Sequence, residues 1–271
     1  MKPVVGYMGG KRSFAAKIFP HLNLTPGRLY VEPYVGMGAV YLYARSQGWD
    51  GPAILNDVNP AVAEFWRCVH RAQLRDLLLE AMQPYVDYER TNAHHKYVAS
   101  LPVPEKPWEM VARWLWLQSV SFGCKPVAVT PNGYTTYGAK YDTAAQRVAA
   151  GQSPGGCVQF ATVVRSVRAL APLTSFRAHV TNRPFPFVVP QGAVVYGDPP
   201  YEGTTGYGME HGNAHVRNLA ALRGVRVVIS EQHATPPEGF MCLDIGTRSS
   251  DLFGVTVASD RREVLFVGGV E

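Results

Sequence analysis

The chain contains four consecutive residues whose groups suit chemistry on an aromatic amine: Asp198, Pro199, Pro200 and Tyr201. They follow the apolar run 193–196, which predicts a buried strand ending at the edge where open α/β sheets bind substrates. There a carboxylate and a backbone carbonyl can accept hydrogen bonds from both N–H groups of an exocyclic amine and turn its lone pair outward, while an aromatic ring stacks on the base. These residues predict methylation of such an amine; a plain strand-to-loop turn is the alternative.

A second candidate loop follows the predicted strand 29–32. It contains Tyr34, Gly36 and Gly38, and the apolar residues 39–44 after it predict the start of a helix. Because glycine has no Cβ, the backbone of this turn can approach a ligand closely, although such turns also serve tight packing of a strand on a helix.

Asp57 follows the next predicted strand, 53–55, and lies about 20 residues beyond the glycines. A carboxylate at this spacing is expected to accept hydrogen bonds from both ribose hydroxyls of a nucleoside cofactor. A turn or helix-cap role beside Asn59 is the alternative. The loop has two glycines and lacks the longer glycine pattern of dinucleotide sites, so S-adenosylmethionine, which has no phosphates, fits it better.

The N-terminal segment adds Tyr7, whose ring can pack on an adenine, and Lys11, whose ammonium can meet a carboxylate such as that of methionine. A flexible basic N-terminus is the alternative interpretation.

Composition is that of a globular protein with a mild basic excess. The 271 residues are 46% hydrophobic, and 26 Lys and Arg against 21 Asp and Glu give a net charge of +5, which favours a polyanionic partner. Four cysteines are scattered singly, so we expect reduced thiols in a cytoplasm and no metal cluster. No signal peptide and no apolar run of membrane-spanning length is evident.

The order of predicted elements indicates one sheet domain with an insertion. A β-α-β-α opening is followed by a long helix from Pro60 to about Met82, then by mainly helical sequence to about residue 172 that includes a helix over 108–120 and a loop or hairpin over 123–141. Further strands are predicted near 176–180, 193–196 and 226–229, and the runs 254–258 and 263–267 are expected to form an antiparallel edge pair.

Taken in order, these motifs resemble the Dam-like, D12 class DNA adenine-N6 methyltransferases of bacteria and their phages. The resemblance spans nearly the whole chain, because residues 133–138 resemble the end of the family's recognition hairpin and 262–266 its last strand; Thr205 and Tyr207 match residues that often follow the catalytic motif. Residues 122–125 depart from the family's usual recognition sequence, so GATC specificity is not implied.

The resemblance implies a seven-stranded, mostly parallel Rossmann-like methyltransferase sheet, with residues 1–62 and 173–271 as catalytic domain and 63–172 as a helical target-recognition insertion. It implies S-adenosyl-L-methionine as cofactor, double-stranded DNA as partner, base flipping, and the cytoplasm of a bacterium or a phage-infected host cell. The implied catalytic residues are Asp198, Pro199, Pro200 and Tyr201. The implied cofactor contacts are Tyr7, Lys11, Glu32, Tyr34, Gly36, Gly38, Asp57 and Asp198.

We expect DNA recognition within the insertion, between Gln118 and Arg168, because its loop places Lys125, Asn132 and Lys140 among Gly, Pro and Tyr residues. Two alternatives remain: methylation of cytosine N4, although the leading Asp favours adenine, and a non-catalytic DNA-binding relative. Other conspicuous residues have simpler interpretations. Trp114 and Trp116 are expected in the core, and His94 and His95 lack a further partner at metal-ligand spacing. Arg165 and Arg168 fall on one helical face and either contact phosphates or form an exposed face.

Overall fold

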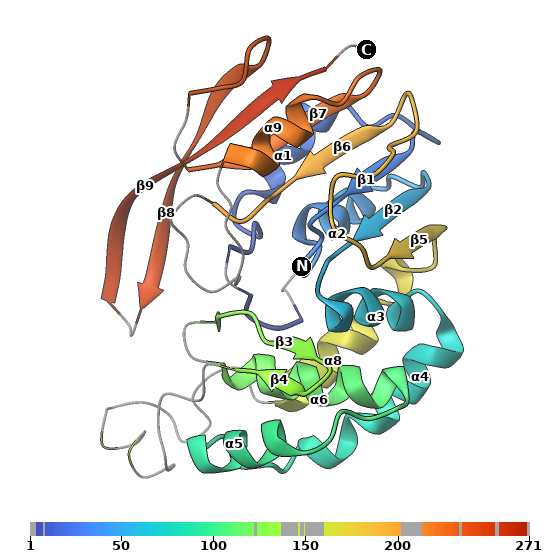
Figure 1. Ribbon diagram of the computed structural model, residues 1–271, viewed down its shortest axis with the longest axis vertical. Helices are drawn as coiled ribbons and strands as arrows, with labels where there is room; N and C mark the ends of the chain where they lie inside the picture. The colour runs from blue at the N-terminus through green and yellow to red at the C-terminus, as the bar shows by residue number, and fades with distance from the viewer. Residues whose placement is uncertain are drawn as a thin grey trace. The chain divides into compact units, whose positions relative to one another are not determined.

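The computed structural model describes residues 4–7, 9–121, 124–136, 146, 149, 160–201, 213–232, 235–252 and 255–269. Within these residues seven strands form one sheet: β1 (Tyr30–Glu32), β2 (Ala53–Asn56), β5 (Ala178–Thr181), β6 (Val194–Gly197), β7 (Arg226–Glu231), β8 (Met241–Leu252) and β9 (Val255–Gly268). Their order is β5-β2-β1-β6-β7-β9-β8 (Figure 1). The pairs β1–β2, β1–β6 and β6–β7 are parallel, whereas β9 is antiparallel to β7 and β8. The predicted α/β class with a seven-stranded, mostly parallel sheet is confirmed.

By its contacts the chain divides into two compact units. One comprises Met1–Gly10 and Asp57–Asn182, and the other comprises Lys11–Asn56 and Arg183–Glu271. We call them the helical unit and the sheet unit and describe each by itself.

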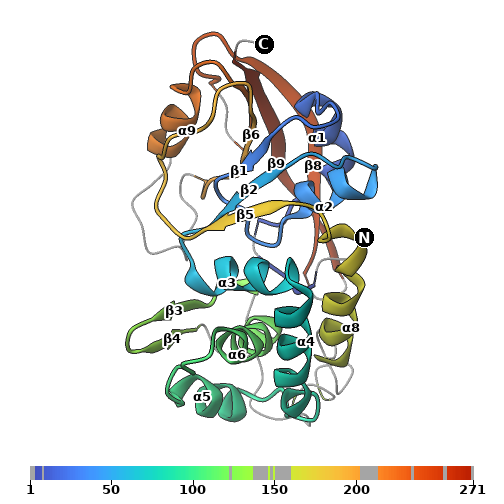
Figure 2. The same ribbon diagram turned by 90° about the vertical axis from the view of Figure 1, so that its right-hand side faces the viewer.

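Buried β-branched residues form the central strands of the sheet unit. Val194, Val195, Val227, Val228 and Ile229 are all 0% exposed, as expected of parallel strands covered on both faces. Helices α1 (Ala15–Leu22) and α2 (Ala39–Ser46) cover one face, and α9 (Asn213–Ala220) covers the other (Figures 1 and 2). The loops after β1, β2 and β6 therefore leave the sheet at one edge, which is the carboxyl end of the parallel strands.

The antiparallel edge pair predicted for the end of the chain is formed by other residues than expected. The runs 254–258 and 263–267 do not pair with each other: their described residues, which exclude Gly254, lie in succession on β9. Residues 259–262 between them contain neither glycine nor proline, so nothing turns the chain there. The partner of β9 is β8, which pairs with it from Met241 opposite Val267 to Leu252 opposite Val255.

The helical unit is built around α6 (Pro107–Val120), which packs against α3, α4, α5 and α8. Trp114 and Trp116 are 0% exposed, so their predicted place in the core is confirmed, as is the helix over 108–120. The elements around α6 are α3 (Pro60–Val69), α4 (Ala72–Ala81), η1 (Gln83–Tyr85), α5 (Asn92–Ser100), α8 (Phe160–Ala169), η3 (Ala171–Leu173) and the antiparallel hairpin of β3 (Ala128–Thr130) and β4 (Gly133–Thr135). No helix in the described ranges is long and apolar enough to cross a membrane.

The long helix predicted from Pro60 to about Met82 is wrong, because the chain breaks into α3 and α4. The carbonyl of Val69, the last residue of α3, accepts hydrogen bonds from Thr174 Oγ1 at 2.8 Å and from Arg75 Nη1 at 3.1 Å. Arg71 then has extended backbone, with φ −122° and ψ 116°. A partner 105 residues away in the chain thus takes the place of the next helical turn, and local periodicity contains no sign of it.

Candidate active site

Strand β6 carries the acidic motif to the carboxyl edge of the sheet unit. Its last residue, Gly197, is buried and lies directly beneath Leu219 of α9, because a Cβ on Gly197 would be 2.4 Å from Leu219 Cδ1. Asp198 follows with a side chain that is 20% exposed, while Pro199 and Tyr201 are buried. The strand therefore presents one partly exposed carboxylate from an otherwise packed tip.

Four side chains from three distant segments of the chain meet at this tip. Lys11 Nζ lies 2.7 Å from Asp198 Oδ1 and 3.4 Å from Glu263 Oε1. The hydroxyl of Tyr201 donates to the same Glu263 oxygen at 2.5 Å, and Lys11 Nζ lies 4.7 Å from the centroid of the Tyr201 ring. Lys11 and Glu263 are only 3% and 1% exposed, so the cation and this carboxylate are both withdrawn from water.

The surroundings shift the proton equilibria of two of these groups. Burial raises the pKa of the Glu263 carboxyl above its usual range; the Lys11 ammonium opposes this shift and the Asp198 carboxylate adds to it. Burial, followed by the charges of Asp198 and Glu263, raises the pKa of the Tyr201 phenol well above its ordinary value. Tyr201 therefore stays protonated at neutral pH and serves as a hydrogen-bond donor.

The glycine loop after β1 has the backbone that the sequence predicted. Gly36 and Gly38 have φ values of 45° and 58°, in the left-handed region that glycine enters without strain. The N–H of Val35 donates to Asn56 O at 2.9 Å, which ties the loop to the end of β2. Gly38 then becomes the N-cap of α2, so the loop passes directly into a helix.

Two polar side chains flank this loop. Glu32, at the end of β1, is 2% exposed and accepts a hydrogen bond from Tyr30 Oη at 2.9 Å. The hydroxyl of Tyr34 lies 2.8 Å from Nδ1 of His215 on α9. Burial raises the pKa of Tyr34, so its phenol is neutral at physiological pH.

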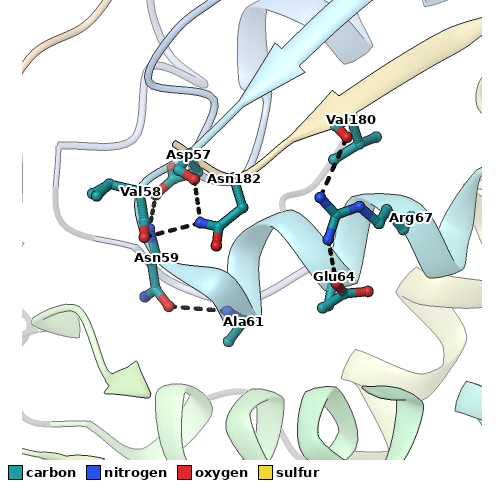
Figure 3. A network of polar contacts seen from close by, with 8 residues as sticks. All are labelled: Asp57, Val58, Asn59, Ala61, Glu64, Arg67, Val180 and Asn182. Carbon is teal, nitrogen blue, oxygen red and sulfur yellow. Dashed lines mark hydrogen bonds and ion pairs between the residues drawn. The ribbon is translucent and has the colours of Figure 1, made fainter. Parts of the chain in front are cut away.

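Asp57, in the helical unit, shapes the turn that starts α3 (Figure 3). Its Oδ1 accepts from the N–H of Asn59 at 2.9 Å, and Asn59 Oδ1 in turn accepts from Ala61 N at 3.1 Å as the helix cap. The side chain of Asn182 donates to the carbonyls of Asp57 at 2.7 Å and Val58 at 3.0 Å. The turn role beside Asn59 that the sequence offered as an alternative for Asp57 is thus present, and Asn59 is the residue that caps α3.

The segment after Asn59 is anchored to β5, which also belongs to the helical unit. Arg67 Nη1 pairs with Glu64, one turn earlier on α3, and Arg67 Nη2 donates to the carbonyl of Val180 (Figure 3). These contacts and those of Asn182 fix the turn that contains Asp57.

Gln118, buried in α6, organises the loop that contains Lys125. Its Nε2 donates to the carbonyls of Gly6, Cys124 and Lys125 at 3.1–3.3 Å, and its Oε1 accepts from Val127 N at 2.9 Å. Lys125 is half-buried. Tyr7, which follows Gly6 in the sequence, is also half-buried, and its carbonyl accepts a hydrogen bond from Gly10 N at 3.1 Å.

Asn132 lies exposed in the turn between β3 and β4, so the predicted hairpin is present and ends in a polar tip. Lys140, Phe122, Gly123, Thr205 and Tyr207 lie outside the described residues.

The remaining residues noted in the sequence have mainly structural surroundings. Arg165 and Arg168 are exposed on α8. His95 is 0% exposed, and neither ring nitrogen has a hydrogen-bond partner in the described part of the chain. Burial lowers its pKa to about 4, and the backbone of Leu117 opposes this shift. His94 is half-buried beside it, and no group of three or more metal-binding side chains occurs among the described residues.

Of the predicted site residues, the sheet unit brings Lys11, Asp198 and Tyr201 together, whereas Tyr7, Asp57, Lys125 and Asn132 belong to the helical unit. Sequence reasoning missed Glu263. One signal was present, because a lone carboxylate directly preceding the apolar residues 264–267 is unusual at a buried strand position.

The sheet is open and mostly parallel, with a glycine loop after its first strand and an acidic motif after a central one. This is the architecture of α/β proteins, which generally bind their ligands at the carboxyl edge of the sheet. The model of the D12 class N6 adenine-specific DNA methyltransferase family matches residues 7–107, so the resemblance noted in the sequence is confirmed over that range. The chain is also similar to the rRNA methyltransferase aviRa from Streptomyces viridochromogenes, with 12% identity and a TM-score of 0.39 over 99% of this chain and 90% of that one. No curated protein matches this sequence.

Proposed function

We propose that this methyltransferase transfers the methyl group of S-adenosyl-L-methionine to N6 of adenine in double-stranded DNA, after flipping the base out of the duplex. The observation that carries the proposal is the tip of β6, where the partly exposed Asp198 carboxylate is held by the buried Lys11 beside the Tyr201 ring. The family match over residues 7–107 supports the same class of reaction.

The residues at the tip have the groups that an aromatic amine requires. Flipping the base costs about a few kcal/mol, which stacking and hydrogen bonds offset. Tyr201 provides the stacking ring; because Lys11 Nζ lies over it at 4.7 Å, a base has to use the opposite face. Asp198 and the Pro199 carbonyl accept hydrogen bonds from the two N–H groups of N6, and Pro200 keeps the loop rigid.

This orientation directs the nitrogen lone pair for in-line attack. S-adenosyl-L-methionine, when bound, supplies a methyl group activated by the sulfonium charge. In the transfer an N–C bond to N6 would form as the C–S bond of the cofactor breaks, with the electron pair kept on sulfur, and the proton lost from N6 would pass to solvent. Neither a metal ion nor a covalent bond to the enzyme is needed for this balance.

The chemistry of the predicted cofactor residues fits this cofactor. Gly36 and Gly38 expose backbone without Cβ atoms at the carboxyl edge of β1. Glu32 and Tyr34 flank the same loop. We assign Asp57 to the ribose hydroxyls, Tyr7 to the adenine ring and Lys11, which also holds the Asp198 carboxylate, to the methionine carboxylate of the cofactor.

We assign DNA recognition to the helical segment 63–172, with Lys125, Asn132 and Lys140 as contacts. The exposed position of Asn132 at a hairpin tip suits reading of base edges, and lysine suits contact with phosphates.

The test is methyl transfer from labelled cofactor to unmethylated bacterial DNA, followed by digestion to nucleosides and chromatography of the product. Label in N6-methyladenine that is abolished by Asp198→Ala supports the proposal. Asp50→Ala, which removes an exposed carboxylate ahead of β2 in the same unit, is the matched control and should leave transfer unchanged. Asp198→Ala activity within about tenfold of wild type contradicts the catalytic assignment.

The same experiment distinguishes the two alternatives. Label in N4-methylcytosine supports a cytosine enzyme, and cofactor binding without transfer to any DNA supports a non-catalytic relative.

A further inference from the structure

We propose that Glu263 is a positioning residue of the methyl-transfer site, which holds the Tyr201 ring and the Lys11 ammonium in place around Asp198. This inference rests on the proposed function and extends it to a strand, β9, that contributes no residue to the predicted site.

The contacts of Glu263 tie together the two residues that border the catalytic carboxylate. One oxygen, Oε1, accepts from the Tyr201 hydroxyl at 2.5 Å and lies 3.4 Å from Lys11 Nζ. Lys11 Nζ is also 2.7 Å from Asp198 Oδ1. A single carboxylate oxygen therefore determines where the aromatic ring and the cation stand relative to Asp198.

The pairing of β9 in the sheet places Glu263 at the same edge as Asp198. Val264, the next residue, pairs with Glu231 at the carboxyl end of β7, so Glu263 lies at the edge where β6 delivers Asp198. On its other side the ladder to β8 shifts register between Asp244 and Gly246, directly opposite Glu263. Such bulges re-aim side chains and are common beside active sites.

Stability alone gives little reason to keep this carboxylate. Glu263 is 1% exposed, its pKa is raised by burial, and its Oε2 has no hydrogen-bond partner among the described residues. Burying a charge with an unsatisfied oxygen costs free energy, and a neutral side chain of similar volume is often as stable or more so. Removing the charge also leaves Lys11 paired with Asp198.

The proposal therefore separates activity from stability. Glu263→Gln keeps the volume and one oxygen but weakens the charge-assisted hydrogen bond that holds the Tyr201 ring, and misplacement of a group beside the reacting atoms costs up to about 100-fold, so we expect kcat to fall about 10- to 100-fold. The melting temperature should stay within about 3 °C of wild type or rise, because the cost of the buried charge is removed. KM for DNA should change by less than about threefold, since Glu263 is buried and the substitution alters the placement of the reacting base rather than contacts with the duplex.

A double-mutant cycle tests whether Glu263 acts through Tyr201. Tyr201→Phe removes the hydroxyl and keeps the ring, and the loss of kcat in Glu263→Gln/Tyr201→Phe should be clearly smaller than the product of the two single losses. Glu238→Gln, the same change at an exposed carboxylate in the segment before β8, is the control and should keep kcat within about twofold.

Three results overturn the inference while leaving the proposed function standing: Glu263→Gln activity within about threefold of wild type, fully multiplicative losses in the cycle, or a loss of kcat explained by a melting temperature more than about 5 °C lower. A wild-type protein that transfers no methyl group to adenine in any DNA refutes the proposed function itself, and the inference falls with it.

Discussion

Gly197 should tolerate no side chain, because it joins the buried strand β6 to Asp198 and has no space for a Cβ. A Cβ there would lie 2.4 Å from Cδ1, 3.1 Å from Cδ2 and 3.3 Å from Cγ of Leu219. Carbon atoms in contact prefer separations of about 3.5–4.0 Å, so the closest pair would overlap by about 1 Å. Leu219 is 0% exposed and packs with Val195 and Ile229, so it cannot swing into solvent.

Gly197→Ala should therefore lower the free energy of unfolding by about 1–3 kcal/mol, the usual cost of overpacking. If the strand tip moves instead of Leu219, methyl transfer should fall about 10- to 100-fold, because Asp198 is the next residue. Leu219→Ala alone should cost about 2–5 kcal/mol. In the double variant the truncated leucine accommodates the new methyl group, so the combined cost should be smaller than the sum.

Urea unfolding of the single and double variants, with transfer assays on the same preparations, measures both effects. Gly48→Ala is the control: Gly48 has φ 86° and no atom within 4 Å of a new Cβ, so its cost is conformational and should simply add to that of Leu219→Ala. Wild-type stability and activity in Gly197→Ala, or full additivity with Leu219→Ala, would refute the contact as the constraint on the strand tip.

Three further predictions concern the helical unit. Asp57→Ala should weaken cofactor binding about 10- to 150-fold. Asp57→Asn keeps the oxygen that accepts from Asn59 N, so it tests the charge without removing the turn contact. An unchanged Kd for the cofactor in both variants would leave Asp57 only its role in the turn. Burial lowers the pKa of His95 from 6.5 to about 4, so the unfolded chain binds a proton at a higher pH than the folded protein does. The free energy of unfolding should therefore fall as pH is lowered from about 6.5 to about 4. At about 1.4 kcal/mol per pH unit, the fall amounts to about 3 kcal/mol. His95→Phe should abolish that fall in denaturation measured from pH 7.5 to 4, while His94→Phe should retain it. Lys125→Ala and Lys140→Ala should flatten the salt dependence of DNA binding by about one unit of slope, whereas Asn132→Ala should relax sequence preference at a cost of about 1–3 kcal/mol; no change in any of the three places recognition elsewhere.

The elements that carry the motifs could be predicted because their signals are local. Strands β1, β2, β6 and β7 are short apolar runs, and the glycines after β1 stand where positive φ is required. Helix α6 is long and apolar enough to be recognised in isolation.

The elements that were missed depend on distant partners or contradict local preferences. Helix α1 contains Pro20, which usually ends a helix. Strand β8 has only three consecutive apolar residues, 241–243, before Asp244, Gly246 and Thr247, and it is held by pairing with β9. The break between α3 and α4 depends on Thr174, and the place of Glu263 depends on Tyr201, 62 residues away in the sequence.

The charged side chains that meet at Asp198 help to decide between a catalytic motif and a plain strand-to-loop turn at residues 198–201. A plain strand-to-loop turn needs only the local preferences of aspartate and proline. Here a lysine from before the first strand and a glutamate from the last strand are withdrawn from water to meet Asp198 and Tyr201. Burying these charges is expensive and hydrophobic residues would fill the same space at lower cost, so a turn gives no reason for them. A site that must hold a carboxylate and an aromatic ring in fixed positions does, and this favours the catalytic interpretation over the turn.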